Sequence, residues 1–261
     1  MREIQAVEKA SGGRLGVAVL DTATGARTNH RGDERFPMCS TFKVLAAGAV
    51  LAKVDAGVEH LERLIKFEPK DVVAYSPITG SHVGGAGMPL REICAAAIEY
   101  SDNTAANLLL SSIGGPAGVT RFARSLGDNV TRLDRIEPGL NEALPGDLRD
   151  TTTPTAMLND VHSLVLGSVL SAVSRDQLKQ WLLGNTTGDE RLRAGVPKGW
   201  RVGDKTGSGD RGTTNDVGIL WPPGHAPVIV SVYLTSSTAS SNARNATIAA
   251  VGRTIAKSYV A

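Results

Sequence analysis

The sequence predicts an α/β sandwich, in which an antiparallel sheet built from both ends of the chain has flanking helices and an all-helical domain is inserted into its connection. Strand-like segments lie near both ends, whereas helical periodicity fills residues 40–185. Of the 261 residues, 41% are hydrophobic and 21% are charged, as in globular proteins with a substantial core. We therefore expect an α/β domain of residues 1–36 and 186–261, a helical domain of residues 37–185, and an active site in the cleft between them.

The expected elements follow in chain order. Glycines end an opening helix in REIQAVEKASGG, and a Thr-Gly turn joins two strands in GRLGVAVLDTATGARTNH. We expect a helix over residues 40–54. Five further helices should begin at Pro89, Asn103, Pro116, Thr153 and Ser174. Glycines and prolines then separate the strands of a meander in GWRVGDKTGSG, TTNDVGILWPPG and APVIVSVYLT, and a last helix covers about residues 242–258.

Composition excludes several classes of function. The net charge of +2 is too small and too evenly scattered for a nucleic-acid surface, and 4% aromatic residues leave few stacking platforms. No stretch reaches the roughly 18 apolar residues of a membrane-spanning helix. The five histidines lack metal-ligand spacing and the two cysteines, Cys39 and Cys94, form no CxxC, so we expect no metal and free, buried thiols.

A serine and a lysine stand three residues apart where an apolar helix begins, in MCSTFKVLAAG. Three residues are most of a helical turn, so the ammonium of Lys43 would lie above the hydroxyl of Ser40 and could assist its deprotonation. The free N–H groups of a helix start favour negative charge at the same place. The pair alone is equally compatible with a capping serine and a lysine that extends to solvent.

The segment KTGSGDRG contains the spacing of a dinucleotide-binding loop at Gly207, Gly209 and Gly212. A strand follows these glycines, whereas a dinucleotide site requires a helix, so we interpret them as a hairpin turn. Lys205 and Thr206 would then end an edge strand and offer a cation and a hydroxyl to an anionic ligand.

Two other polar segments are ambiguous by themselves. Ser101, Asp102 and Asn103 precede a helix in YSDNTAANLLL, where a plain N-cap cluster would explain them equally well. Residues 127–153 are long, polar and aperiodic, which indicates either a functional loop or a surface connector.

Taken together and in this order, STFK, SDN, EPGLN and KTG resemble the signature of class A β-lactamases, and the resemblance spans nearly the whole chain. It implies the fold of serine β-lactamases and penicillin-binding proteins, and hydrolysis of penicillin- and cephalosporin-type antibiotics through a serine acyl-enzyme without a cofactor. The small-molecule β-lactam would be the partner of a monomer. The family's task also implies a periplasmic or secreted protein, whose signal peptide is absent from the given chain.

The resemblance assigns four catalytic roles. Ser40 would be the nucleophile, Ser101 would relay a proton to the lactam nitrogen, and Glu137 would activate the hydrolytic water. Either Lys43 or Glu137 would serve as the base during acylation, and the sequence does not choose between them. We expect the cation of Lys205 to lower the pKa of Lys43.

The resemblance also implies a set of substrate-binding residues, which are Tyr75, Asn103, Asn141, Arg191, Lys205, Thr206, Gly207 and Ser208. Backbone N–H groups of Ser40 and Ser208 would hold the carbonyl oxygen of the acyl-enzyme. Lys205 and Thr206 would hold the substrate carboxylate, and Asn103 would bind its side-chain amide.

The long loop and the mouth of the cleft complete this expectation. Asn141 stands four residues after Glu137 in the EPGLN motif that would position the water, and Tyr75 would wall the mouth of the cleft. An ion pair between Arg135 and Asp150 would pin the ends of an Ω-loop.

The chain departs from the family pattern at the carboxylate-binding strand. Many members carry an arginine where this chain has Thr214. Arg191 resembles the substitute arginine that other members supply from a neighbouring helical segment, so we expect it to take that role.

The cysteine pairs of some relatives are incomplete here. Ala47 stands where Cys94 would find its partner, and Gly209 stands where Cys39 would find its own. The resemblance therefore implies no disulfide bond.

Two alternative functions stay open at this point. One is a penicillin-binding carboxypeptidase or transpeptidase that acts on D-Ala-D-Ala peptides, and the other is a β-lactam sensor that is acylated without turnover. Both should lack a deacylating acid in the long loop, so Glu137 and its EPGLN motif argue against them.

Overall fold

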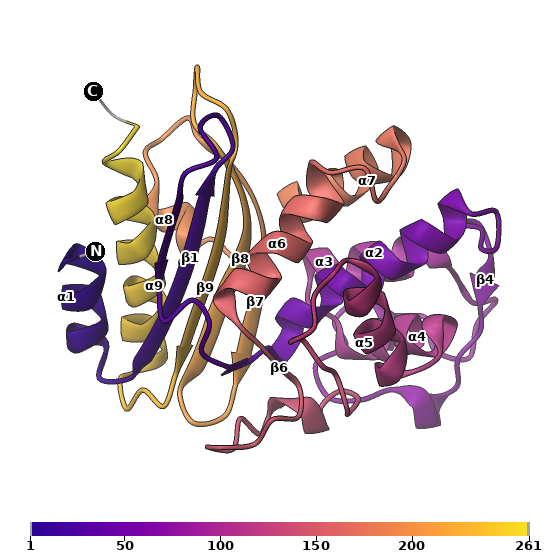
Figure 1. Ribbon diagram of the computed structural model, residues 1–261. Helices are drawn as coiled ribbons and strands as arrows, with labels where there is room; N and C mark the ends of the chain where they lie inside the picture. The colour runs from indigo at the N-terminus through magenta and orange to yellow at the C-terminus, as the bar shows by residue number, and fades with distance from the viewer. Residues whose placement is uncertain (1, 260–261) are drawn as a thin grey trace.

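A computed structural model describes residues 2–259, and its main feature is a five-stranded antiparallel sheet in the order β2-β1-β9-β8-β7 (Figure 1). The strands are β1 (Arg14–Asp21), β2 (Arg27–His30), β7 (Arg201–Gly209), β8 (Thr213–Trp221) and β9 (Val228–Thr235). Strand β1 pairs along its whole length with β9, from Arg14 opposite Thr235 to Asp21 opposite Val228. The prediction of a sheet built from both ends of the chain is confirmed.

Helices cover both faces of this sheet. On one side lie α1 (Arg2–Ser11), the short α8 (Leu192–Gly195) and α9 (Ser241–Ala256), and on the other lie α2 to α7 (Figure 1). In β1, Leu15 and Val17 contribute to the core beneath α1 and α9, whereas Ala18 and Leu20 belong to the core shared with the other helices. Both faces of the strand are thus buried, which explains its nearly continuous apolar sequence.

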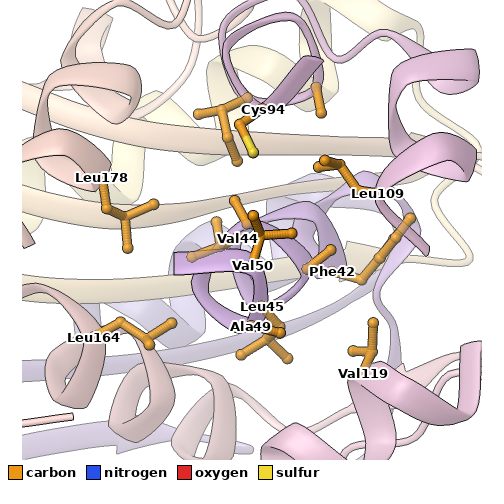
Figure 2. Close-up of a cluster of buried hydrophobic side chains, with 14 of the residues drawn as sticks. Phe42, Val44, Leu45, Ala49, Val50, Cys94, Leu109, Val119, Leu164 and Leu178 are labelled. Carbon is orange, nitrogen blue, oxygen red and sulfur yellow. The ribbon is translucent and has the colours of Figure 1, made fainter. Parts of the chain in front are cut away.

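The remaining α-helices pack around one apolar helix, α2 (Phe42–Asp55). They are α3 (Leu90–Glu99), α4 (Asn103–Ile113), α5 (Pro116–Ser125), α6 (Pro154–Val165) and α7 (Ala172–Leu183). Residues 42–51 of α2 are all buried, and Figure 2 shows its side chains facing Cys94, Leu109, Val119 and Leu164 from four surrounding helices. A helix that is apolar on every side has no free direction in which to move, so it fixes the residues at its start.

The helix expected from Ser40 begins differently. Residues 39–41 form a 3₁₀ turn, η1 (Cys39–Thr41), and the α-helix starts at Phe42. Cys39 has a φ of 46°, in the left-handed region, at the point where the chain leaves the short strand β3 (Phe36–Pro37) and enters η1. Similarly, α7 starts two residues before Ser174, because the hydroxyl of Ser171 caps it by accepting a hydrogen bond from the Ser174 N–H.

Several short elements were not predicted, because two to four residues carry no readable period. They are β3 (Phe36–Pro37), which pairs with β6 (Thr151–Thr152), β4 (Leu64–Ile65), which pairs with β5 (Met88–Pro89), the 3₁₀ turns η2 (Pro69–Asp71), η3 (Thr79–Ser81) and η4 (Gly139–Asn141), and α8.

The expected division into two domains at residues 36/37 and 185/186 stays a prediction. One buried core joins α2 to side chains of β8 and β9, among them Val217, Ile219 and Tyr233, so the helices and the sheet pack as neighbours. No helix within residues 2–259 is long and apolar enough to cross a membrane.

Candidate active site

A cleft of about 570 Å³ gathers residues from six parts of the chain. The predicted site residues that line it are Ser40, Tyr75, Ser101, Asn103, Asn141, Arg191, Thr206 and Ser208. Of the other predicted residues, Lys43, Glu137 and Lys205 are buried and bonded to residues of this lining, and Gly207 is flanked by Thr206 and Ser208 in β7. Thr186 and Thr187 also line the cleft and were not predicted.

Ser40 and Lys43 meet at one carboxylate oxygen. Ser40 Oγ donates a hydrogen bond to Glu137 Oε1 at 3.1 Å, and Lys43 Nζ lies 3.1 Å from the same oxygen. Lys43 Nζ also donates to Ser101 O at 2.7 Å and to Asn103 Oδ1 at 2.8 Å. With Ser101 Oγ at 3.4 Å, four oxygen atoms surround Lys43 Nζ, an environment that suits an ammonium group.

Burial dominates the electrostatics of the two lysines. Burial lowers the pKa of Lys43, and the neighbouring Glu137 carboxylate opposes that shift. The pKa of Lys205 falls well below its usual value, first through burial and then through the charge of Lys43. Lowering of the Lys43 pKa was predicted correctly, but the cause proposed for it, the charge of Lys205, was wrong because loss of hydration is the larger effect.

The buried carboxylate is held from its backbone and from its side chain. The Glu137 N–H donates to Asn107 Oδ1 at 2.9 Å, and Asn107 Nδ2 donates to Glu137 O at 3.0 Å. Asn141 Nδ2 donates to Glu137 Oε2 at 2.5 Å. Asn107 was missed from the sequence, although it lies four residues after Asn103 and therefore on the same face of α4.

Asn141 keeps one polar atom free for another partner. Its Nδ2 is used by Glu137 Oε2 and by Pro138 O, whereas its Oδ1 is buried and accepts no hydrogen bond from the described residues. An acceptor in this position, beside a carboxylate, suits a small donor that can bond to both.

The expected ion pair at the base of the long loop is present. Arg135 Nε lies 2.6 Å from Asp150 Oδ2, and Arg135 also pairs with Glu142. The other oxygen of Asp150 accepts the N–H groups of Asp134 and Arg135 at 2.8 and 3.0 Å. One buried carboxylate thus joins the two ends of the loop that carries Glu137.

A row of donors lies along β7. Lys205 Nζ donates to Ser101 Oγ at 3.0 Å and to Thr206 O at 2.8 Å. At Gly207 a Cβ would come within 2.8 Å of Met38 O, so only glycine lets β7 pass this close to the turn that carries Ser40.

The guanidinium of Arg191 lies at the far end of this row. Its Nη2 donates to Ser208 Oγ at 2.7 Å, and its Nη1 donates to the carbonyls of Gly207 and Asn215. Asn245, which was not predicted, accepts a hydrogen bond from Arg191 Nε at 3.0 Å. Thr214 stands opposite Ser208 in β8, so Arg191 lies beside the strand position where many relatives carry an arginine, and Arg244 Nε, which was not predicted, donates to Thr214 Oγ1 itself at 3.1 Å.

Asn103 and Tyr75 are coupled through the backbone. The Asn103 N–H donates to Tyr75 O at 3.0 Å, and Asn103 Nδ2 donates to Ala74 O at 3.0 Å. Tyr75 has 60% of its surface exposed and a left-handed φ of 61°, which turns its ring outward at the edge of the cleft.

The two cysteines, Cys39 and Cys94, are free and buried. Burial raises the pKa of both thiols. Within residues 2–259 no group of three or more histidine, cysteine or acidic side chains is arranged to hold a metal ion.

Comparison with known proteins points to one family. Residues 1–259 match the model of the "Beta-lactamase enzyme family". Over 258 residues, which are 99% of this chain and 88% of each relative, the chain is 51% identical to β-lactamase CTX-M-8 of Citrobacter amalonaticus and 50% identical to β-lactamase Toho-1 of Escherichia coli.

Solved structures agree with the sequence relatives. An ancestral class A β-lactamase is 61% identical, with a TM-score of 0.97 over 99% of both chains. A putative class A β-lactamase of Rhodopseudomonas palustris is 60% identical, with a TM-score of 0.97 over 98% of both chains.

Proposed function

This chain belongs to the class A β-lactamase family, and from that membership we propose how its cleft carries out the family's reaction. The enzyme hydrolyses the amide bond of β-lactam antibiotics and so confers resistance to them. One observation carries the residue assignment: the Ser40 hydroxyl, the Lys43 ammonium and the Glu137 carboxylate meet within 3.1 Å at a buried point of the cleft.

In the first step, Ser40 Oγ attacks the lactam carbonyl and gives its proton to Glu137. Glu137 Oε1 is the acceptor to which that hydroxyl already donates. Lys43 is surrounded by oxygen acceptors, and as an ammonium group it has no lone pair with which to receive this proton. Backbone N–H groups of Ser40 and Ser208 stabilise the negative charge that develops on the carbonyl oxygen.

Cleavage of the carbon–nitrogen bond requires a proton on the departing nitrogen. Ser101 Oγ supplies it and is reprotonated by Lys43, whose Nζ lies 3.4 Å away, and Lys43 recovers a proton from Glu137 at 3.1 Å. The second cation, Lys205 at 3.0 Å from Ser101 Oγ, stabilises the hydroxyl oxygen while its proton is in transfer. The product of this step is an ester between Ser40 and the opened ring.

Hydrolysis of that ester returns the enzyme to its starting state. Glu137 takes a proton from a water molecule, which attacks the ester carbonyl, and then returns that proton to Ser40 Oγ as the ester bond breaks. Asn141 orients the water, because its free Oδ1 and the Glu137 carboxylate can accept the two protons of one molecule.

The substrate is positioned by its anion and its side chain. Lys205, Thr206, Ser208 and Arg191 form the cationic and hydroxyl-bearing wall that holds the carboxylate, with the backbone of β7 passing close at Gly207. On the opposite wall, Asn103 binds the side-chain amide and Tyr75 closes the mouth of the cleft.

We also propose that the enzyme acts as a monomer in the periplasm or outside the cell. The support is the family's task, since β-lactams must be destroyed before they reach their targets. Its partner is the small-molecule substrate alone.

Turnover of a chromogenic cephalosporin tests the proposal. The purified protein should hydrolyse many molecules per active site, and Ser40→Ala should abolish this. Glu137→Gln should slow acylation and, more strongly, hydrolysis of the ester, so that prolonged incubation accumulates a covalent adduct whose mass equals protein plus substrate. A single stoichiometric burst from the unaltered protein would instead indicate a sensor, and deacylation of Glu137→Gln at the parental rate would refute the role of Glu137.

A further inference from the structure

A chain of hydrogen bonds leads from the floor of the cleft to a buried aspartate. Thr187, in the segment between α7 and α8, lies with its Oγ1 2.5 Å from Thr206 Oγ1 and donates to Asn185 Oδ1 at 2.7 Å. Asn185 Nδ2 donates in turn to Asp204 Oδ2 at 2.6 Å. Asn185 and Asp204 are buried, whereas Thr187 is half-buried and lines the cleft.

The direction of this chain follows from one backbone group. The Thr187 N–H donates to Asn185 Oδ1 at 3.0 Å, which identifies that side-chain atom as the amide oxygen. An oxygen there can only accept, so the Thr187 hydroxyl gives its single proton to Asn185. Thr187 Oγ1 can therefore only accept from Thr206, and the free protein holds the Thr206 proton turned away from the substrate.

Substrate binding reverses this arrangement. In the proposed function, on which this inference rests, the Thr206 hydroxyl donates to the carboxylate of the β-lactam. It would then face Thr187 with lone pairs on both oxygens at 2.5 Å, which is repulsive unless Thr187 also turns its proton toward Thr206. The turn leaves no buried acceptor unpaired, because Asn185 Oδ1 keeps the Thr187 N–H.

We propose that Thr187 is a positioning residue for the substrate carboxylate. By turning its proton, it donates to Thr206 and makes the Thr206 hydroxyl a stronger donor to the anion, as in other chains of hydrogen bonds. Thr187 contributes only when the substrate carries a negative charge beside Thr206. It acts through Thr206 and touches no reacting atom.

A penicillin and its methyl ester separate this role from a structural one. For Thr187→Val, KM for the acid should rise about 3- to 10-fold with kcat within about 2-fold, as expected for loss of one hydrogen bond. The kcat/KM for the ester should stay within about 2-fold of the parent. Thr187→Ser, which keeps the hydroxyl, should have the parental KM for the acid, and Thr187→Ala should show the same rise in KM as Thr187→Val. Thr254→Val, in α9, is the matched control for loss of a threonine hydroxyl.

Three results would overturn the inference. Equal losses for the acid and the ester would show that Thr187 only shapes the cleft. If KM for the acid were as high in Thr187→Ser as in Thr187→Val, loss of the hydroxyl could not be the cause of the rise. Absence of any turnover by the unaltered protein would refute the proposed function itself, and this inference with it.

Discussion

Two buried carboxyl groups line one cavity beside α6, and replacing one of them should change how stability depends on pH. Asp160 lies in α6, and Asp128 lies in the turn after α5. In each of them Oδ2 is buried and has no hydrogen-bond partner among the described residues, and the charge of Asp128 is near enough to act on Asp160. Burial, followed by the charge of Asp128, raises the pKa of Asp160 to about 9. The pair therefore carries one proton at neutral pH.

The size of the effect follows from proton linkage. The pKa of an aspartate in the unfolded chain is about 3.9, so between pH 4 and 9 the folded protein binds one more proton than the unfolded protein. The contribution of Asp160 to stability is complete below the unfolded pKa and is lost as pH rises toward the folded pKa. Within this window the free energy of unfolding falls by about 1.4 kcal/mol per pH unit, or about 2.7 kcal/mol from pH 5 to pH 7.

Asp160→Asn should remove this dependence. The asparagine does not titrate, and its Nδ2 can donate to Asp128 Oδ2 in place of the carboxyl proton. We expect the difference in unfolding free energy between variant and parent to shift by about 2.7 kcal/mol in favour of the variant from pH 5 to pH 7. Urea unfolding followed by far-UV circular dichroism at half-unit pH intervals measures this difference.

The control lies in the same cavity. Asp33 also lines it but is exposed, so Asp33→Asn removes a carboxylate without removing the buried pair and should leave the slope unchanged. His162 on α6 and the nearby arginines, Arg27 and Arg124, are common to all three proteins and cancel in the difference. Parallel stability curves for Asp160→Asn and the parent would refute the shared proton.

Three further predictions concern the loop and the thiols. Asn107→Ala removes both backbone hydrogen bonds of Glu137 and should slow hydrolysis of the acyl-enzyme about 10-fold or more; equal acylation and deacylation rates in stopped-flow traces of variant and parent would contradict this. Asp150→Ala leaves the Arg135 guanidinium and two loop N–H groups without their acceptor and should destabilise the fold by about 2–4 kcal/mol; calorimetry at neutral pH measures it, and an unchanged unfolding midpoint would exclude a structural role. Without reductant, Cys39 and Cys94 should resist a thiol reagent in the native state and both react in denaturant; mass measurement counts the labels, and no labelling in denaturant would reveal a disulfide.

Site residues could be predicted from the sequence only where local spacing or the order of motifs identified them. Ser40 and Lys43 could be paired because three residues fix their relative position on one turn, and Glu137 could be assigned because its motif resembles a family's. The hydrogen bonds between Asn107 and Glu137 could not be predicted, because they join α4 to a loop without regular period. The main cause of the Lys43 pKa shift was missed for the same reason, since burial of α2 on every side arises only when distant helices pack.

The same limit applies to the fold. Turn residues and runs of strand-forming residues were enough to predict β1, β7, β8 and β9, because each of them spans eight or nine residues. The four-residue β2 was predicted from the Thr-Gly turn that joins it to β1. Neither α8 nor the β3–β6 pair has enough residues to show a periodic pattern. The hydrogen bonds of Thr187 to Asn185 and Thr206 join side chains, and no sequence periodicity predicts them.

The pairing of β1 with β9 affects how the enzyme is made. Strand β1 leaves the ribosome before helices α2 to α7 and must wait for Val228–Thr235, about 200 residues later in the chain, before it gains its inner neighbour. The nascent chain thus carries its nucleophile, Ser40, for most of translation without the strand that bears Lys205 and Thr206. A chain truncated before β9 loses the centre of its sheet, so activity should appear only after β9 has been translated.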